Sequence, residues 1–67
     1  MHELSIVYEL YRTVTQLAAE AGLHRVEAVR LQVGELSGVE GPYLRECWNA
    51  VVRDTPLRST RLELEHL

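Results

Sequence analysis

The first three residues, Met1, His2 and Glu3, carry several nitrogen atoms that could surround one metal ion. A free Met1 amine can chelate together with the backbone nitrogen and the imidazole of His2. The adjacent peptide nitrogens, up to that of Glu3, suit metals that accept tetragonal or square-planar nitrogen ligands, Ni(II) and Cu(II), better than tetrahedral Zn(II). We expect Met1 to be retained, because initiator methionine is normally removed only before small residues. The competing interpretation is an ordinary, frayed terminal histidine.

Other residues with reactive side chains fit structural roles better. Cys47 lies on the same helical stripe as several large apolar residues, which predicts a buried, inert thiol rather than a nucleophile. His24 and His66 are expected at the surface, one in a loop and one near the end of the sequence. Glu35 and Glu40 could be an acid–base pair, but such a pair needs a pocket that so short a chain can hardly enclose. We therefore expect no enzyme activity, and a loop-shaping role for Glu35.

Residues 3–21 should form the first helix. Apolar residues recur there at spacings of three and four, which predicts an amphipathic helix with one buried stripe. The residues of this stripe are Leu4, Val7, Tyr8, Tyr11, Val14, Leu17, Ala18 and Ala21. Gly22 follows directly and fits the left-handed position that often closes a helix.

The rest of the chain predicts strand, helix and strand. Apolar and polar residues alternate over 26–33, which indicates a strand with one buried face. Residues 34–41 should be a loop, and Pro42 suits the first position of a helix that ends near Asp54. Alternation resumes over 61–67, which indicates the second strand.

This order predicts an α/β (α+β) fold in which two helices pack on one face of a small sheet. Strands joined through a helix favour a parallel pair. A two-stranded sheet is a poor independent unit, and residues 61–67 leave backbone groups unpaired along one edge. We therefore expect a homo-oligomer, formed through the open sheet edge or by exchange of the first helix.

Length and composition indicate one small domain spanning residues 1–67. A core of this size usually needs support from a disulfide, a metal or a partner, and a single cysteine excludes an internal disulfide. A net charge of −3 argues against a nucleic-acid surface, and no apolar stretch approaches the roughly 20 residues that cross a bilayer. The lone cysteine and the absence of a secretory signal pattern favour a cytoplasmic protein.

Two motifs resemble the HypA/HybF family of hydrogenase nickel-incorporation proteins. These are the opening Met-His-Glu-Leu-Ser of residues 1–5 and the Val-Gly-Glu-Leu-Ser-Gly-Val-Glu of residues 33–40. The resemblance covers essentially the whole chain. It implies a nickel site at the Met1 amine, His2 and the backbone of Glu3, to which Glu40 adds an oxygen by analogy with an acidic residue of some members.

The same resemblance exposes a difference. The family normally continues into a zinc domain with two Cys-x-x-Cys pairs, whereas this sequence has only Cys47, so zinc is not expected here. The chain therefore resembles the family's nickel-binding domain alone. The resemblance implies a metallochaperone that passes Ni(II) to a HypB-type GTPase and the large subunit of nickel–iron hydrogenase, or to urease maturation. The alternatives are a metal-free protein interaction module, or an inactive fragment lacking the zinc domain.

Overall fold

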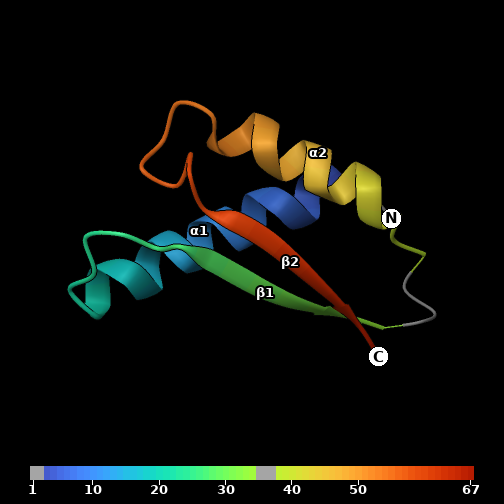
Figure 1. Ribbon diagram of the computed structural model, residues 1–67, viewed down its shortest axis with the longest axis horizontal. Helices are drawn as coiled ribbons and strands as arrows, with labels where there is room; N and C mark the ends of the chain where they lie inside the picture. Colours follow the sequence, from blue (N-terminus) through green and yellow to red (C-terminus); the bar gives the residue numbers. More distant parts are fainter. Residues whose placement is uncertain (1–2, 35–37) are drawn as a thin grey trace.

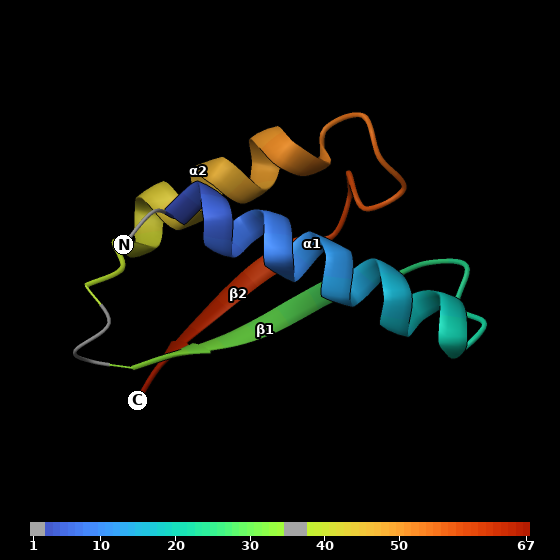
Figure 2. The same cartoon turned by 180° about the vertical axis from the view of Figure 1, so that it is seen from behind.

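Residues 3–34 and 38–67 are described by the computed structural model, in the predicted order of helix, strand, helix and strand (Figure 1). The elements are α1 (Glu3–Glu20), β1 (Ala28–Val33), α2 (Gly41–Val52) and β2 (Arg61–His66). From behind, α1 crosses the molecule in front of the two strands (Figure 2). Among the described residues, no helix is long and apolar enough to cross a membrane.

Helix α1 ends as its sequence predicts. Gly22 has a φ of +68°, the left-handed conformation that glycine adopts without steric cost. Its N–H donates to the carbonyl of Ala19 at 3.2 Å, and the N–H of Leu23 donates to that of Ala18 at 2.9 Å. This pair of hydrogen bonds is the Schellman motif, which satisfies carbonyls that the helix cannot pair by itself. The last helical residue is Glu20, one before the predicted end.

The buried face of α1 is narrower than predicted. Only Val7 is fully buried, while Ile6, Leu10, Tyr11 and Val14 pack partly against the core. The other large members of the predicted stripe are about half exposed; they are Leu4, Tyr8 and Leu17. The prediction was wrong for these three residues, because α1 packs chiefly against one neighbour, α2, and a single helix contact covers only a narrow face.

Strands β1 and β2 pair in parallel, as predicted, from Ala28 opposite Arg61 to Val33 opposite His66. Strand β1 begins two residues later than predicted, since the carbonyl of Val26 accepts a hydrogen bond from the Thr60 hydroxyl instead of joining the strand ladder.

The two faces of the sheet differ in chemistry. On the outer face, Arg30 pairs with Glu63 at 3.5 Å, and the amide of Gln32 donates to the carboxylate of Glu65 at 3.3 Å. The opposite face is apolar and joins the core with residues of both helices; its members are Val29, Leu31, Val33, Leu62 and Leu64. The two helices therefore share one face of the sheet, as predicted.

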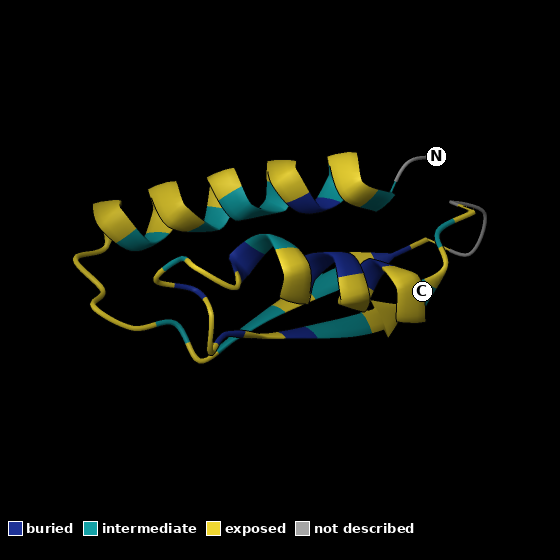
Figure 3. Ribbon diagram, turned by 90° about the horizontal axis from the view of Figure 1, so that it is seen from above, coloured by how far each residue is buried: buried dark blue, intermediate teal, exposed yellow. Residues whose placement is uncertain are grey.

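The core is centred on Trp48 of α2, which is fully buried together with Leu44 and Val7. Figure 3 shows the buried segments of both helices turned towards the interior, with exposed residues on their outer sides. The indole of Trp48 donates a hydrogen bond to the Thr60 carbonyl. Cys47 is 7% exposed, which confirms the predicted buried thiol.

Both ends of α2 differ slightly from prediction. The helix starts at Gly41, so that Pro42 still lies in its first turn, where a missing N–H costs nothing. It ends at Val52 rather than near Asp54. The reason is local, since the hydroxyl and the N–H of Thr55 both donate to the Val52 carbonyl and turn the chain there.

Candidate metal centre

Two of the predicted site residues, Glu3 and Glu40, lie together at one end of the molecule, where both helices begin. Met1 and His2 lie outside the described residues, as does Glu35. Glu3 is the first residue of α1, and Glu40 directly precedes α2. The backbone N–H of Glu40 donates a hydrogen bond to Oε2 of Glu3 at 3.1 Å. Residues 37 positions apart in sequence are thus joined at this end.

The two glutamates differ in what their side chains do. Glu3 is half-buried as a residue, and its carboxylate holds the segment before α2 through the Glu40 N–H. The side chain of Glu40 is exposed. Within the described part of the chain, no hydrogen bond or ion pair occupies the Glu40 carboxylate. Glu40 can therefore offer an oxygen to a ligand, whereas Glu3 chiefly fixes the local backbone.

The electrostatics of this end favour anionic donors. Helices α1 and α2 both start here, and the N-terminal end of a helix carries partial positive charge that stabilises negative groups within the first turn. This partial charge stabilises carboxylates, and it also stabilises a backbone nitrogen that loses its proton to bind a metal. The same helix ends disfavour a bare cation, so anionic donors would have to offset that repulsion.

Tyr43, in the first turn of α2, belongs to the same region and was missed by the sequence reasoning. Its pKa is raised above 10.0, first by the charge of Cys47 and a hydrogen bond with that side chain, then by desolvation and the carboxylates of Glu3 and Glu46. The sequence feature that could have indicated Tyr43 was its position, an aromatic residue three places after Glu40.

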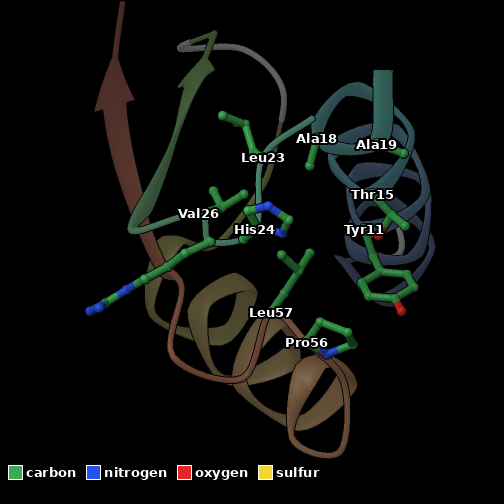
Figure 4. A pocket seen from close by; sticks show the side chains of 10 residues that line it. Tyr11, Thr15, Ala18, Ala19, Leu23, His24, Val26, Pro56 and Leu57 are labelled. Atoms are coloured by element: carbon green, nitrogen blue, oxygen red, sulfur yellow. The ribbon is translucent and has the colours of Figure 1, made fainter. Parts of the chain in front are cut away.

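His24 and His66 lie at opposite ends of the described part of the molecule. His24 lines a cavity of about 230 Å³ between the C-terminal half of α1 and the segment that contains Pro56 and Leu57 (Figure 4). The segment that follows α1, which includes His24, lies at the opposite end of the molecule from the starts of α1 and α2 (Figure 1). His66 is the last residue of β2 and lies beside the start of α2.

Side chains of the described residues do not by themselves make a metal site. Over residues 3–34 and 38–67, no three His, Cys, Asp or Glu side chains are grouped so that they could hold an ion. A site at this end therefore needs further donors. Backbone nitrogens and the groups of Met1 and His2 are the ones that the sequence supplies there.

Comparisons with known proteins identify the family of the chain. The family model described as "Hydrogenase/urease nickel incorporation, metallochaperone, hypA" matches residues 1–67. The hydrogenase maturation factor HypA of Chlorobaculum parvum is 42% identical over 65 residues, covering 97% of this chain and 58% of that protein. HypA of Chloroflexus aurantiacus is 39% identical over 67 residues, covering 100% and 59%. The chain thus spans somewhat more than half the length of these relatives.

The fold has a solved counterpart. The solution structure of the nickel metallochaperone HypA from Helicobacter pylori matches with a TM-score of 0.91 and 20% sequence identity, covering 100% of this chain and 58% of that one. At 20% identity, the match shows a similarity of fold alone. The family model covers the whole chain and the Chlorobaculum relative is 42% identical, and on these grounds the chain belongs to the HypA family of hydrogenase and urease nickel-incorporation metallochaperones.

Proposed function

We propose that this chain captures Ni(II) through its first three residues and presents it for hydrogenase maturation. The supporting observation is the hydrogen bond from the Glu40 N–H to the Glu3 carboxylate. It ties the residue that follows Met1 and His2 to the segment that carries Glu40. In the sequence, His2 directly precedes Glu3, the residue whose carboxylate makes this contact.

The donors suit nickel held for transfer. The Met1 amine, the His2 backbone nitrogen and imidazole, and the Glu3 backbone nitrogen form a nitrogen-rich set of the kind that Ni(II) accepts. Glu40 adds an oxygen. A site at the surface of a small domain can exchange ligands with an incoming partner, which a metallochaperone requires and a structural metal site does not.

The proposed delivery of Ni(II) to other proteins is based on the role of the family. The recipients would be a HypB-type GTPase and then the large subunit of nickel–iron hydrogenase, or the urease maturation machinery, all in the cytoplasm. The chain itself catalyses no reaction in this proposal. It binds, holds and releases the ion.

Calorimetric titration of the untagged protein with Ni(II) tests the proposal. We expect one equivalent to bind, and replacement of His2 with Ala or extension of the N-terminus by one residue to abolish this site. His24→Ala is the matched control, because His24 lines the cavity beside the C-terminal half of α1, whereas the proposed site lies where the helices begin. Affinity should fall as the pH drops through about 6.5, since the imidazole must lose its proton to bind. A His2→Ala protein that binds as tightly as the parent contradicts the proposal.

A second candidate, a metal-free interaction module, is favoured by one observation. Leu4 and Tyr8, one turn apart on α1, are 45% and 54% exposed, so an apolar strip remains outside the core. A helix face of this kind can dock into a partner's groove. Nickel titration separates the two functions, because a module of this type binds no nickel and loses nothing when His2 is replaced.

A further inference from the structure

Strand β1 has an open edge on the side away from β2. The N–H of Arg61 donates to the carbonyl of Glu27 just before β1, and Val29, Leu31 and Val33 continue this ladder. Because backbone groups alternate along a strand, the residues between these point their N–H and C=O groups outward. They are Ala28, Arg30 and Gln32. Over residues 3–34 and 38–67, no hydrogen bond takes up these backbone groups.

The open edge of β2 is partly occupied. By the same alternation, Leu62 and Leu64 turn their backbone groups away from β1. Nε of Arg45, on α2, donates a hydrogen bond to the Leu62 carbonyl at 3.4 Å. Figure 1 shows β2 on the side of α2 and β1 on the other side. The side chain of Arg45 therefore obstructs strand addition at β2, and β1 has the freer edge.

The apolar face of the sheet continues to the open edge of β1. Val29 and Leu31 pack towards the core, yet both are only half-buried. On α1, Ile6 and Leu10 are one turn apart and are half-buried as well. A cavity of about 170 Å³ is lined by Ile6 together with Leu31 and Val33. A strand added to β1 would therefore cover apolar side chains in addition to pairing the backbone.

We propose that β1 pairs with β1 of a second copy of this chain, antiparallel and centred on Leu31. In this register Leu31 faces Leu31 of the second molecule, and Val29 faces its Val33, so that apolar side chains meet on the inner face. Arg30 faces Gln32 of the second molecule, and the outward backbone groups of these two residues exchange hydrogen bonds. The twofold axis repeats this exchange and produces a continuous sheet in the order β2-β1-β1-β2.

The polar face of the sheet favours this register. A pair centred on Arg30 would place two arginines directly opposite each other, which is destabilising. Gln32 donates from its side-chain amide to Glu65 at 3.3 Å, so its side-chain oxygen can still accept a hydrogen bond. Arg30 pairs with Glu63 at 3.5 Å and retains further N–H donors for that oxygen. The edge is therefore self-complementary, since each copy supplies the donor that the other accepts.

The competing explanation is association through β2, where Arg61 could face Glu65 across an antiparallel pair. That pairing requires the Leu62 carbonyl, which already accepts a hydrogen bond from Arg45. Exchange of α1 between two molecules is another route, and it leaves both edges of the sheet open. The three arrangements protect different backbone amides from exchange with solvent.

Amide hydrogen exchange of the full chain, followed by NMR over a dilution series, distinguishes the three arrangements, and sedimentation velocity measures the mass. We expect a dimer at high concentration, in which the amides of Arg30 and Gln32 exchange at least about tenfold more slowly than in the dilute monomer. The amides of Leu64 and His66 should exchange equally fast at both concentrations. A monomer at every concentration would overturn the inference, as would a dimer that protects Leu64 and His66 or neither edge.

The variant Gln32→Lys tests the register. The new ammonium group can still pair with Glu65 of its own chain, but it faces Arg30 of the second molecule at both symmetric positions. We expect dimerisation to weaken about tenfold, because like charges lie directly opposite, while thermal unfolding of the dilute protein is unchanged. Arg61→Gln is the matched control, since it changes a charged residue of β2, and it should dimerise like the parent. An unchanged dimerisation constant for Gln32→Lys would contradict the pairing of Arg30 with Gln32.

Discussion

The indole nitrogen of Trp48 donates a hydrogen bond of 2.9 Å to the backbone carbonyl of Thr60. This bond joins the middle of α2 to the residue that enters β2. Thr60 is itself buried, and its hydroxyl donates to the carbonyl of Val26, just before β1. One side chain and its acceptor thereby connect a helix to the start of both strands.

Replacing Trp48 with Phe should destabilise the protein by about 2 to 4 kcal/mol, because it leaves a void in the core and a buried carbonyl without its donor. Chemical denaturation measures the change. Tyr8→Phe is the control, since Tyr8 is 54% exposed and should change stability little. An equally small effect at Trp48 would show that the hydrogen bond and the ring do not organise the core.

Replacing Gly22 with Ala should destabilise the protein by about 1 to 2 kcal/mol. The cost is conformational only, because Gly22 has a φ of +68° and a Cβ there would contact nothing within 4 Å. Gly34→Ala is a matched control: it also has open space, but no positive φ. Thermal unfolding should show a lower midpoint for Gly22→Ala alone. Equal midpoints for the two variants would contradict a conformational cost at Gly22.

The phenol of Tyr43 should ionise above pH 10, since its pKa is raised above 10.0, mainly by Cys47. The folded protein then holds this proton more tightly than the unfolded chain. The resulting stability is present below pH 10 and is lost as the pH rises through the folded-state pKa. NMR titration of the Tyr43 ring measures the pKa, and Cys47→Ala should lower it. An unchanged midpoint in that variant would rule out Cys47 as the cause.

Replacing Glu40 with Gln should weaken nickel binding about tenfold and change the absorption of the complex. The substitution keeps the shape of the side chain and the backbone N–H that binds Glu3, so only the charged oxygen is lost. Glu20→Gln, at the far end of α1, is the control. Unchanged affinity and spectrum for Glu40→Gln would count decisively against an oxygen ligand at this position.

The isolated chain should self-associate. Its two-stranded sheet leaves one edge of β1 and one of β2 outside the ladder, and such edges add strands from other molecules. Arg61 and Glu65 could face one another across an antiparallel pair of β2 strands. Light scattering over a dilution series should show a mass that falls with concentration. A monomer at every concentration, with ordinary thermal stability, would contradict this prediction.

Local signals account for what the sequence predicted correctly. Gly22 closes α1 because its left-handed conformation is a property of the residue itself, and alternation identifies β1 and β2 because each strand has one buried face. The end of α2 was less predictable. It depends on which donors reach the Val52 carbonyl, and Thr55 supplies two of them.

The site could be predicted only in part. Met1, His2, Glu3 and Glu40 came from chelate chemistry and family resemblance, but nothing in their spacing indicates that the Glu40 N–H binds the Glu3 carboxylate. Such a contact depends on how α1 and α2 pack. The approach of His66 to Gly41 has the same origin, since it requires both the parallel register and the absence of a side chain at position 41.

The parallel pairing of β1 and β2 also sets the order in which the protein can fold. Cross-strand partners such as Gln32 and Glu65 are 33 residues apart, so the sheet is a non-local structure that forms slowly compared with a hairpin. During synthesis, β1 has no partner until residues 61–66 have been made. Its apolar side chains therefore remain exposed until α2 and β2 follow, and this interval is when the nascent chain is most prone to aggregate.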